Sequence, residues 1–298
     1  MAVVADGATS SAGRDAREIS GPWPAPAKLN LFLNIVGRRP DGYHLLQTVF
    51  QFIDFSDELY FSVRGDGIIR RTRAVPDVVP AADLALRAAR LLQAATGSTL
   101  GVDIRLDKRL PIGGGLGGGS SDAATVLLVL DRLWKTGLGV EALATLGLEL
   151  GADVPVFVRG QAAWAEGVGE DLRPIELPEP WFLIVIPNVT VSTAEVFSDP
   201  ELTRDAPPIT IADFLAGGGL NNCEPIVRRR FPAVAEALDR LARYARPRLT
   251  GTGGCVFAAF EQREAAEEVL ARLPGGWRGL VARGRNRSPL MEALGTAC

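Results

Sequence analysis

A glycine-rich segment at 110–124, LPIGGGLGGGSSDAA, contains the residue types that point most directly to chemistry. Two runs of three glycines lead through two serines into an apolar stretch. Glycine permits positive φ angles and brings backbone N–H groups close to a ligand. At a helix start these groups join the unpaired donors of the first turn, where the helix dipole favours negative charge. The segment predicts a phosphate-binding loop, with a linker or hairpin of no chemical consequence as the alternative.

Two common phosphate-loop patterns fit this segment poorly. A Walker loop requires a lysine directly before its Ser or Thr, and a glycine stands there. The dinucleotide pattern G-x-G-x-x-G matches at positions 113, 115 and 118, but almost any run so rich in glycine contains it. Such a loop also follows its strand directly and needs an acidic residue about 20 residues later on the next strand. Asp131 falls inside a predicted helix instead, so a Rossmann-type oxidoreductase is the weaker hypothesis.

A third pattern, P-x-x-x-G-L-G-G-G-S-S-D-A-A, fits without a gap from Pro111 to Ala124. It resembles the phosphate loop of the galactokinase, homoserine kinase, mevalonate kinase and phosphomevalonate kinase (GHMP) superfamily. This resemblance implies that ATP is the phosphoryl donor. It assigns the binding of the ATP phosphates to Pro111, Gly113, Gly114, Gly115, Leu116, Gly117, Gly118, Gly119, Ser120 and Ser121.

Other motifs narrow the resemblance. They are PAKLNLFL at 26–33, RPDGYH at 39–44, LGADVPVF at 150–157, AEGVGE at 165–170 and LTGTGGCVF at 249–257. In this order and spacing the set closely resembles the branch of the superfamily that phosphorylates 4-diphosphocytidyl-2-C-methyl-D-erythritol in the non-mevalonate isoprenoid pathway. The resemblance extends from Trp23 to about Leu290. It implies transfer to the 2-hydroxyl of that substrate, giving the 2-phosphate and ADP.

Phosphoryl transfer needs a cradle for phosphates, charge neutralisation, and a group that orients or deprotonates the acceptor hydroxyl. On sequence alone, Asp153 is typical of a turn and Lys28 of a solvated charge at a strand start. The resemblance instead implies that Asp153 is the catalytic base and that Lys28 lies beside it and polarises the acceptor oxygen. Pro155 predicts an extended backbone at Val154, directly after the aspartate.

Tyr43 and His44 are the candidates for recognition of a pyrimidine. Such a base needs a flat apolar face and a few polar groups at its edge, and this pair supplies both. The resemblance implies that His44 pairs with the cytosine edge, with Tyr43 against the ring and Phe197 on its other face; an ordinary core phenylalanine is the alternative. It adds contacts from Asn30, Val168, Thr193, Thr250, Gly251, Thr252 and Gly253, the last four of which a plain turn before a strand would also explain.

The chain departs from the usual family pattern near the nucleotide. Asp83 stands before Leu84 where the family often has asparagine, and a carboxylate accepts hydrogen bonds but cannot donate them, which leaves the adenosine contact open. No glutamate stands out as a Mg²⁺ ligand. We therefore expect Mg²⁺ to be held mainly by ATP and by Ser120 or Ser121, while Asp122 either assists or stabilises the helix start.

Two further functions stay open at this point. A non-catalytic nucleotide-binding module is disfavoured because both Lys28 and Asp153 are present. Another GHMP member, such as a mevalonate-type kinase, would have no use for the Tyr43–His44 pair, since its substrate carries no nucleobase.

Composition restricts the remaining classes of protein. The 298 residues are 47% hydrophobic and 22% charged with a net charge of −3, which offers no basic face for nucleic acid. The three cysteines form neither CxxC pairs nor a secreted framework, and no apolar run has the length of a signal peptide or membrane span. These features predict a cytoplasmic enzyme whose partners are its small-molecule substrate and ATP, not a membrane. The sequence does not specify an oligomeric state.

The elements that must position these residues follow from periodicity. We expect strands over 29–35, 45–53, 58–63, 102–106, 181–186, 256–260 and 279–282, and helices over 81–95, 121–135, 140–150, 233–244 and 261–273. Interspersed strands and helices predict an α+β fold. The strand over 256–260, the helix over 261–273 and the strand over 279–282 follow one another and suggest a split β-α-β layer. The resemblance adds two domains with the active site in the cleft between them. Pro178 and Pro180 place the boundary, giving a disordered tail over 1–20, an ATP-binding domain over 21–177 and a substrate-side domain over 178–298.

Overall fold

The computed structural model describes residues 18–74, 79 and 81–296. Within them, ten strands form one sheet whose main path has the order β3-β4-β2-β10-β7-β9-β8, with β1 and β5 also paired to β2 and β6 paired to β5. The strands are β1 (Ser20–Arg38), β2 (His44–Arg64), β3 (Ile69–Arg71), β4 (Gly101–Asp107), β5 (Ala163–Glu166), β6 (Asp171–Pro174), β7 (Trp181–Ile186), β8 (Pro247–Leu249), β9 (Val256–Phe260) and β10 (Arg278–Arg285).

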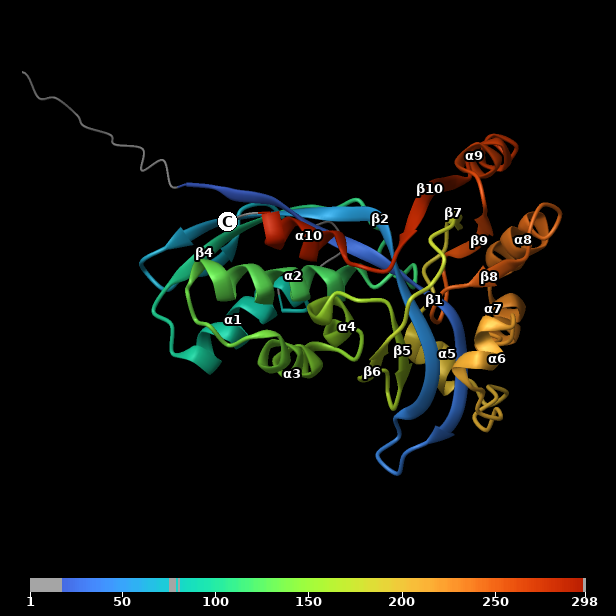
Figure 1. Cartoon of the computed structure of the whole chain (residues 1–298), viewed down its shortest axis with the longest axis horizontal. Coiled ribbons are helices and arrows are strands. Elements are labelled where there is room, and N and C mark those ends of the chain that lie inside the picture. The colour runs from blue at the N-terminus through green and yellow to red at the C-terminus, as the bar shows by residue number, and fades with distance from the viewer. Residues whose placement is uncertain (1–17, 75–78, 80, 297–298) are drawn as a thin grey trace, which may run out of the picture.

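The helices of the described residues fall into two groups (Figure 1). One group, with β4, occupies the left half of the view: α1 (Leu84–Thr96), α2 (Gly118–Leu133), α3 (Val140–Leu150), α4 (Val154–Arg159) and α10 (Pro289–Thr296). The other lies around β7 to β9 at the right: α5 (Thr193–Ser198), α6 (Ile211–Leu215), α7 (Glu224–Arg230), α8 (Pro232–Leu241) and α9 (Arg263–Ala271).

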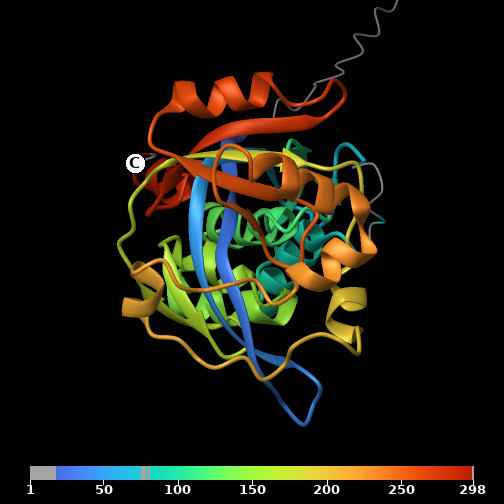
Figure 2. The same cartoon turned by 90° about the vertical axis from the view of Figure 1, so that its right-hand side faces the viewer.

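The long antiparallel pair of β1 and β2 connects the two halves, and Figure 2 shows it running through most of the height of the molecule. Phe52 and Phe61 of β2 belong to the core around α1 and α2, whereas Leu33 and Ile35 of β1 belong to the core of the other half. The expected strand over 29–35 is confirmed but is longer at both ends. Four register irregularities in β1 reset the alternation of buried and exposed side chains, so the period-2 pattern is visible only locally.

Helix α2 is apolar around most of its circumference, as its sequence predicted, because it packs against α1, α4 and β1 at once. Helix α1 begins at an N-cap where the Asp83 carboxylate accepts from the backbone N–H groups of Ala85 and Leu86, and it ends at Gly97 in the left-handed conformation. The α+β expectation is confirmed.

The split β-α-β layer is also confirmed. Strands β9 and β10 both pair antiparallel with β7, so they run parallel to each other with β7 between them and α9 as their connection. The final helix, however, leaves this half of the molecule. Leu290 of α10 is buried in the core built on α1 and α2, so the chain returns to its N-terminal half after β10. The domain limits at 177 and 178 stay a prediction.

One local prediction was wrong. Val154 is not extended before Pro155; it is the first residue of α4, and Asp153 is the N-cap with φ −80° and ψ −15°. A proline in the first turn removes an N–H that would be unpaired anyway, so the helix tolerates it there. Of the predicted tail, residues 1–17 lie outside the described residues, and Ser20 already begins β1. No helix in the described part of the chain is long and apolar enough to cross a membrane.

Candidate active site

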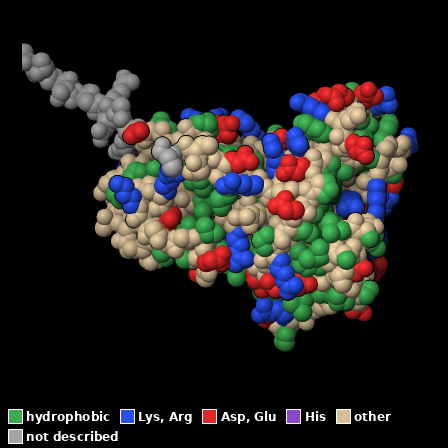
Figure 3. Space-filling model, viewed as in Figure 1, with side chains coloured by type: hydrophobic (Ala, Val, Ile, Leu, Met, Phe, Trp, Pro, Cys, Tyr) green, Lys and Arg blue, Asp and Glu red, His purple; other side chains and the backbone are tan. Residues whose placement is uncertain are grey.

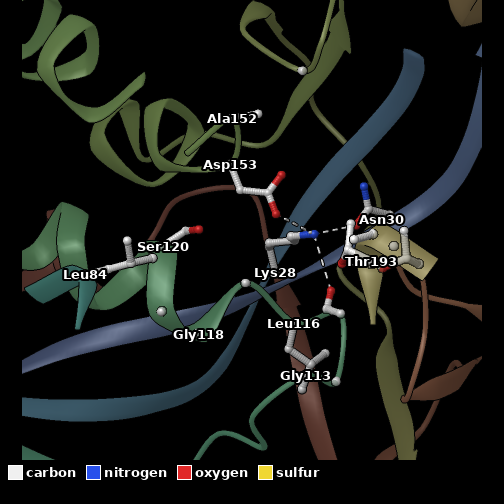
Figure 4. A pocket seen from close by; sticks show the side chains of 18 of the residues that line it. Lys28, Asn30, Leu84, Gly113, Leu116, Gly118, Ser120, Ala152, Asp153 and Thr193 are labelled. Carbon is white, nitrogen blue, oxygen red and sulfur yellow. Dashed lines mark hydrogen bonds and ion pairs between the residues drawn. The ribbon is translucent and has the colours of Figure 1, made fainter. Parts of the chain in front are cut away.

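A cavity of about 930 Å³ opens where the glycine-rich segment meets β1, β2 and loops from the second half of the chain. Figure 4 shows its wall from close by. Most of the predicted site residues line it: Lys28, Asn30, Tyr43, His44, Pro111, Gly113, Gly114, Gly115, Leu116, Gly117, Gly118, Gly119, Ser120, Asp153, Val168, Thr193, Phe197, Gly251 and Thr252. Residues separated by more than 200 positions in the sequence thus share one cavity.

Three predicted residues lie behind this wall instead. Ser121 is buried in the first turns of α2. Thr250 is fully buried and joins two parts of the site, since its hydroxyl donates to Gly115 O at 3.1 Å and accepts from the Asn30 backbone N–H at 3.1 Å. The N–H of Gly253 donates to Thr250 O at 3.0 Å. These residues shape the loops rather than the surface that a ligand would meet.

The glycine-rich segment leads directly into α2 at the cavity. Gly117 is the N-cap of α2 with φ 73° and provides no side-chain cap, so the N–H groups of the first turn remain for a ligand. Gly115, with φ 76°, passes so close to the loop around Thr250 that a Cβ would lie 2.2 Å from Thr250 O. The two glycine-rich loops therefore pack backbone to backbone, which a larger residue at 115 would prevent.

Lys28 and Asp153 form an ion pair of 3.1 Å at the end of this loop. The Lys28 side chain is only 3% exposed, whereas that of Asp153 is 35% exposed and faces the cavity. The Lys28 ammonium also donates to Asn30 Oδ1 at 2.5 Å and to Gly115 O at 3.3 Å (Figure 4). An ammonium and a carboxylate are thereby fixed side by side next to the helix N-terminus, an arrangement that can orient and deprotonate a hydroxyl.

Asn30 supports the lysine as well as lining the cavity. Its amide nitrogen donates to Thr48 Oγ1 at 3.0 Å, so its oxygen is the atom that faces Lys28. The Thr48 hydroxyl in turn donates to Phe32 O. This chain of hydrogen bonds fixes the Asn30 side chain from β2, a role that the sequence motif did not reveal.

His44 and Phe197 meet at the other end of the cavity. Their rings are stacked, with centroids 4.9 Å apart and planes at 22°. Burial lowers the pKa of His44, and the positive charges of Arg204 and Arg38 lower it further. Tyr43 is 64% exposed at the rim. The sandwich of a base between Tyr43 and Phe197 stays a prediction, and in this structure His44 covers one face of Phe197.

Two positioning contacts had no recognisable sequence signal. Arg204 Nε donates to His44 Nε2 at 3.1 Å from 160 residues away. The Asn221 amide donates to Leu249 O at 2.9 Å and to Gly251 O at 2.8 Å, which holds the second glycine-rich loop in place. The Thr193 and Thr252 hydroxyls are hydrogen-bonded at 2.9 Å across that loop.

A charge cluster lies beside the phosphate loop, and two of its members, Lys108 and Asp122, also line the cavity. The Lys108 ammonium bridges Asp57 Oδ2 at 2.6 Å and Asp122 Oδ2 at 2.7 Å. Burial raises the pKa of Asp122 to about 7, although the charge of Lys108 opposes this shift. Burial also acts to lower the pKa of Lys108, but the attraction of Asp122 and Asp57 outweighs it, so the pKa of the lysine is raised. One cation thus serves two buried carboxylates, and whether Asp122 assists the ion or stabilises the start of α2 stays a prediction.

Asp83, the departure from the family pattern, is used by the fold. Besides capping α1 it forms an ion pair with Arg71 at 2.6 Å, and both side chains are nearly buried. Asp83 also lines the cavity. As for metals, no group of three or more His, Cys, Asp or Glu side chains within residues 18–74, 79 and 81–296 could hold an ion.

Comparison with known proteins assigns the family. The family described as GHMP kinases N terminal domain matches residues 83–161, and the one described as GHMP kinases C terminal matches residues 209–279. A 4-diphosphocytidyl-2-C-methyl-D-erythritol kinase of Nitrosococcus oceani is 59% identical over 91% of this chain and 97% of the relative. The kinase of the same name from Ectopseudomonas mendocina is 61% identical over 91% of this chain and 93% of the relative.

Solved structures agree with this assignment. The crystal structure of a 4-(cytidine 5'-diphospho)-2C-methyl-D-erythritol kinase superposes with a TM-score of 0.77 at 34% identity, over 90% of this chain and 99% of that one. A mevalonate kinase with a TM-score of 0.68 and 18% identity shares the fold alone. This chain is an ATP-dependent kinase of the GHMP superfamily and belongs to the 4-diphosphocytidyl-2-C-methyl-D-erythritol kinase family.

Proposed function

We propose that this kinase transfers the γ-phosphoryl group of ATP to the 2-hydroxyl of 4-diphosphocytidyl-2-C-methyl-D-erythritol in the non-mevalonate isoprenoid pathway. The observation that carries the proposal is the 3.1 Å ion pair of Lys28 and Asp153, which lies between the phosphate loop and the end of the cavity that holds His44 and Phe197. Its family relatives carry the name of this activity.

The ATP phosphates would bind at the start of α2. Gly118, Gly119 and Ser120 line the cavity there, and the unpaired N–H groups of this turn and the helix dipole favour an anion. The phosphoryl group in flight carries charge on its equatorial oxygens, so catalysis consists mainly of positioning and electrostatic stabilisation. The buried ammonium of Lys28, adjacent to Gly115 of this loop, supplies a positive charge close to that point.

Asp153 would accept the proton of the acceptor hydroxyl. As the acceptor oxygen bonds to the γ-phosphorus and the bond from that phosphorus to the bridging oxygen of ADP breaks, the proton passes to the carboxylate. A tertiary alcohol has a pKa far above neutral, so this proton moves late, when the new bond has largely formed. Lys28 fixes the carboxylate and polarises the acceptor oxygen.

Recognition of the cytidine would occur at the other end of the cavity. His44 would read the edge of the base, and Tyr43 and Phe197 would offer the aromatic faces. The proposed substrate contacts of Asn30, Val168, Thr193, Gly251 and Thr252 are consistent with their position in the cavity wall. For Thr250 and Gly253 the contacts described above favour a supporting role.

We propose that Mg²⁺ enters with the nucleotide and neutralises phosphate charge. Ser120 lines the cavity and no hydrogen bond joins its hydroxyl to another described residue, so it is free to act as a ligand beside the phosphate oxygens. Mg²⁺ commonly uses one or two protein oxygens together with substrate phosphates.

The cytoplasmic location and the absence of nucleic-acid and membrane partners stay predictions from composition. On the face shown in Figure 3, acidic and basic side chains are interspersed.

The proposed substrate is tested by an ADP-release assay that compares the cytidylyl methylerythritol substrate with mevalonate and homoserine at equal concentrations. We expect ADP release above background only with the cytidylyl substrate. Faster release with mevalonate or homoserine would contradict the proposed acceptor while leaving the kinase chemistry intact.

A further inference from the structure

The hydrogen bond between Arg204 and His44 determines where the imidazole proton lies. A guanidinium is always protonated and has N–H donors but no acceptor. Because Arg204 Nε donates to His44 Nε2 at 3.1 Å, Nε2 must offer its lone pair. The ring is then neutral with its proton on Nδ1. No hydrogen bond joins Nδ1 to another described residue, and His44 lines the cavity, so this N–H is left for a ligand.

Arg204 is itself held rigidly. Its remaining nitrogens donate to three backbone carbonyls in the last turn of α5 and the segment after it: Phe197 O at 3.0 Å, Asp199 O at 2.8 Å and Leu202 O at 3.1 Å. Phe197 also stacks on the His44 ring, with the two planes 22° apart. The same short segment therefore fixes the imidazole at one edge and on one face.

We propose that Arg204 is a positioning residue for the pyrimidine subsite, which holds His44 as the neutral Nδ1–H tautomer so that the ring donates a hydrogen bond to an acceptor atom of the base. Cytosine offers two such atoms at its pairing edge, the carbonyl oxygen and the unprotonated ring nitrogen. The identity of the base rests on the proposed function, whereas the tautomer does not.

The electrostatic surroundings agree with a neutral ring. Arg204 approaches from the segment after α5 and Arg38 from the end of β1, and both positive charges oppose protonation of His44, as burial does. Protonation would also direct an Nε2–H at the guanidinium, which cannot accept it. The fold thus favours the form that can donate from Nδ1 and accept at Nε2.

The tautomer can be observed directly because His44 is the only histidine in the chain. In a protein without a histidine tag, labelled with ¹⁵N-histidine, the imidazole gives a single pair of nitrogen signals that need no assignment between residues. Multiple-bond ¹H–¹⁵N correlation near neutral pH should show a protonated Nδ1 and an unprotonated Nε2. A protonated Nε2, or an imidazolium, in the wild-type enzyme would overturn the proposal.

Two arginine variants separate the hydrogen bond from the charge. Arg204→Met should release the Nδ1–H tautomer and raise the pKa of His44 toward its usual value, about 6.5. Arg38→Met is the matched control, because it removes a nearby charge but no hydrogen bond to His44. It should raise the pKa and leave the tautomer unchanged. An unchanged tautomer in Arg204→Met would also overturn the proposal.

Kinetics supply a second readout. In Arg204→Met the KM for the cytidylyl substrate should rise by about tenfold at pH values where the His44 ring is neutral, because its proton is then no longer held on Nδ1, while the KM for ATP stays constant. Equal increases in both KM values would contradict a role confined to the pyrimidine. Arg204→Lys keeps the charge without the fork of donors and replaces Arg204→Met if that variant fails to fold. The wild-type spectrum needs no substrate, so it stays decisive even if the proposed function fails.

Discussion

At the scale of single residues, the carboxylate of Asp153 is the group on which the proposed proton transfer depends. Asp153→Asn keeps the size of the side chain and an oxygen that can accept from Lys28, but removes the proton acceptor. We expect kcat to fall by about a hundredfold to ten-thousandfold with the Kd for both substrates within a few-fold. Turnover and binding are measured separately, with Asp171→Asn, an exposed aspartate outside the cavity wall, as the control. A variant that keeps more than about a tenth of the wild-type kcat would show that Asp153 is not the base.

Lys28 tests whether the site needs an ammonium or only a positive charge. Its nitrogen lies between Asn30, Gly115 and Asp153 with a side chain 3% exposed, which leaves no room for a planar fork. Lys28→Ala should lower kcat by about a hundredfold, and Lys28→Arg should not restore it. Lys135→Arg, at an exposed lysine after α2, is the matched control. Full activity of Lys28→Arg in a steady-state assay would mean that net charge alone matters there.

At the scale of elements, Gly117 links the start of α2 to the catalytic pair. A Cβ there would lie 2.7 Å from Phe157 Cζ and 3.1 Å from Lys28 Cε. Gly97 has nearly the same backbone, φ 64° and ψ 18° against 73° and 19°, with open space around it. Gly97→Ala should therefore lose only the left-handed cost of about 1–2 kcal/mol and keep its kcat. Gly117→Ala should lose about 1–3 kcal/mol more and lower kcat, because the ring and the lysine must shift. Chemical denaturation and kinetics check both; equal effects would contradict the packing argument.

The cluster beneath α2 gives a stability change with pH. Burial raises the pKa of Asp122 from 3.8 to about 7, so between these values the folded protein holds a proton that the unfolded chain has lost. This contribution to the free energy of unfolding is complete below pH 3.8 and is lost as the pH rises to about 7. Asp122→Asn removes it, so its stability relative to the wild type should increase with pH and become constant above about 7. Denaturation midpoints at several pH values measure the difference, and one that does not change with pH would contradict the shift.

At the scale of the whole molecule, local sequence patterns predicted the helices and strands better than the contacts between them. The helix α2 and the strands β7, β9 and β10 could be predicted because each of these elements is a short segment with one periodicity. The full length of β1 was not, because register irregularities interrupt its alternation. The helix at Val154 was hidden by a proline whose local preference the first turn of α4 overrides.

The candidate site divides in the same way. Glycine-rich loops and the Lys28 and Asp153 motifs could be identified by resemblance, and the structure brings them into one cavity. Arg204 and Asn221 could not be identified in this way, because neither belongs to a motif. Each supports the site through hydrogen bonds to a segment that is distant in the sequence. The return of α10 to the N-terminal core was also not predicted, because the sequence analysis identified no element after residue 282.

The central claim is that the site of Lys28 and Asp153 phosphorylates the 2-hydroxyl of the cytidylyl substrate, and the product tests it most directly. Carbon 2 of the methylerythritol unit carries no hydrogen, so a phosphate on it has no three-bond coupling to a proton. We predict that the proton-coupled ³¹P spectrum of the wild-type reaction gains an unsplit phosphomonoester signal, with none from Asp153→Asn in the same time. A phosphomonoester signal split by a neighbouring proton, or an unsplit one formed as fast by Asp153→Asn, would contradict the account.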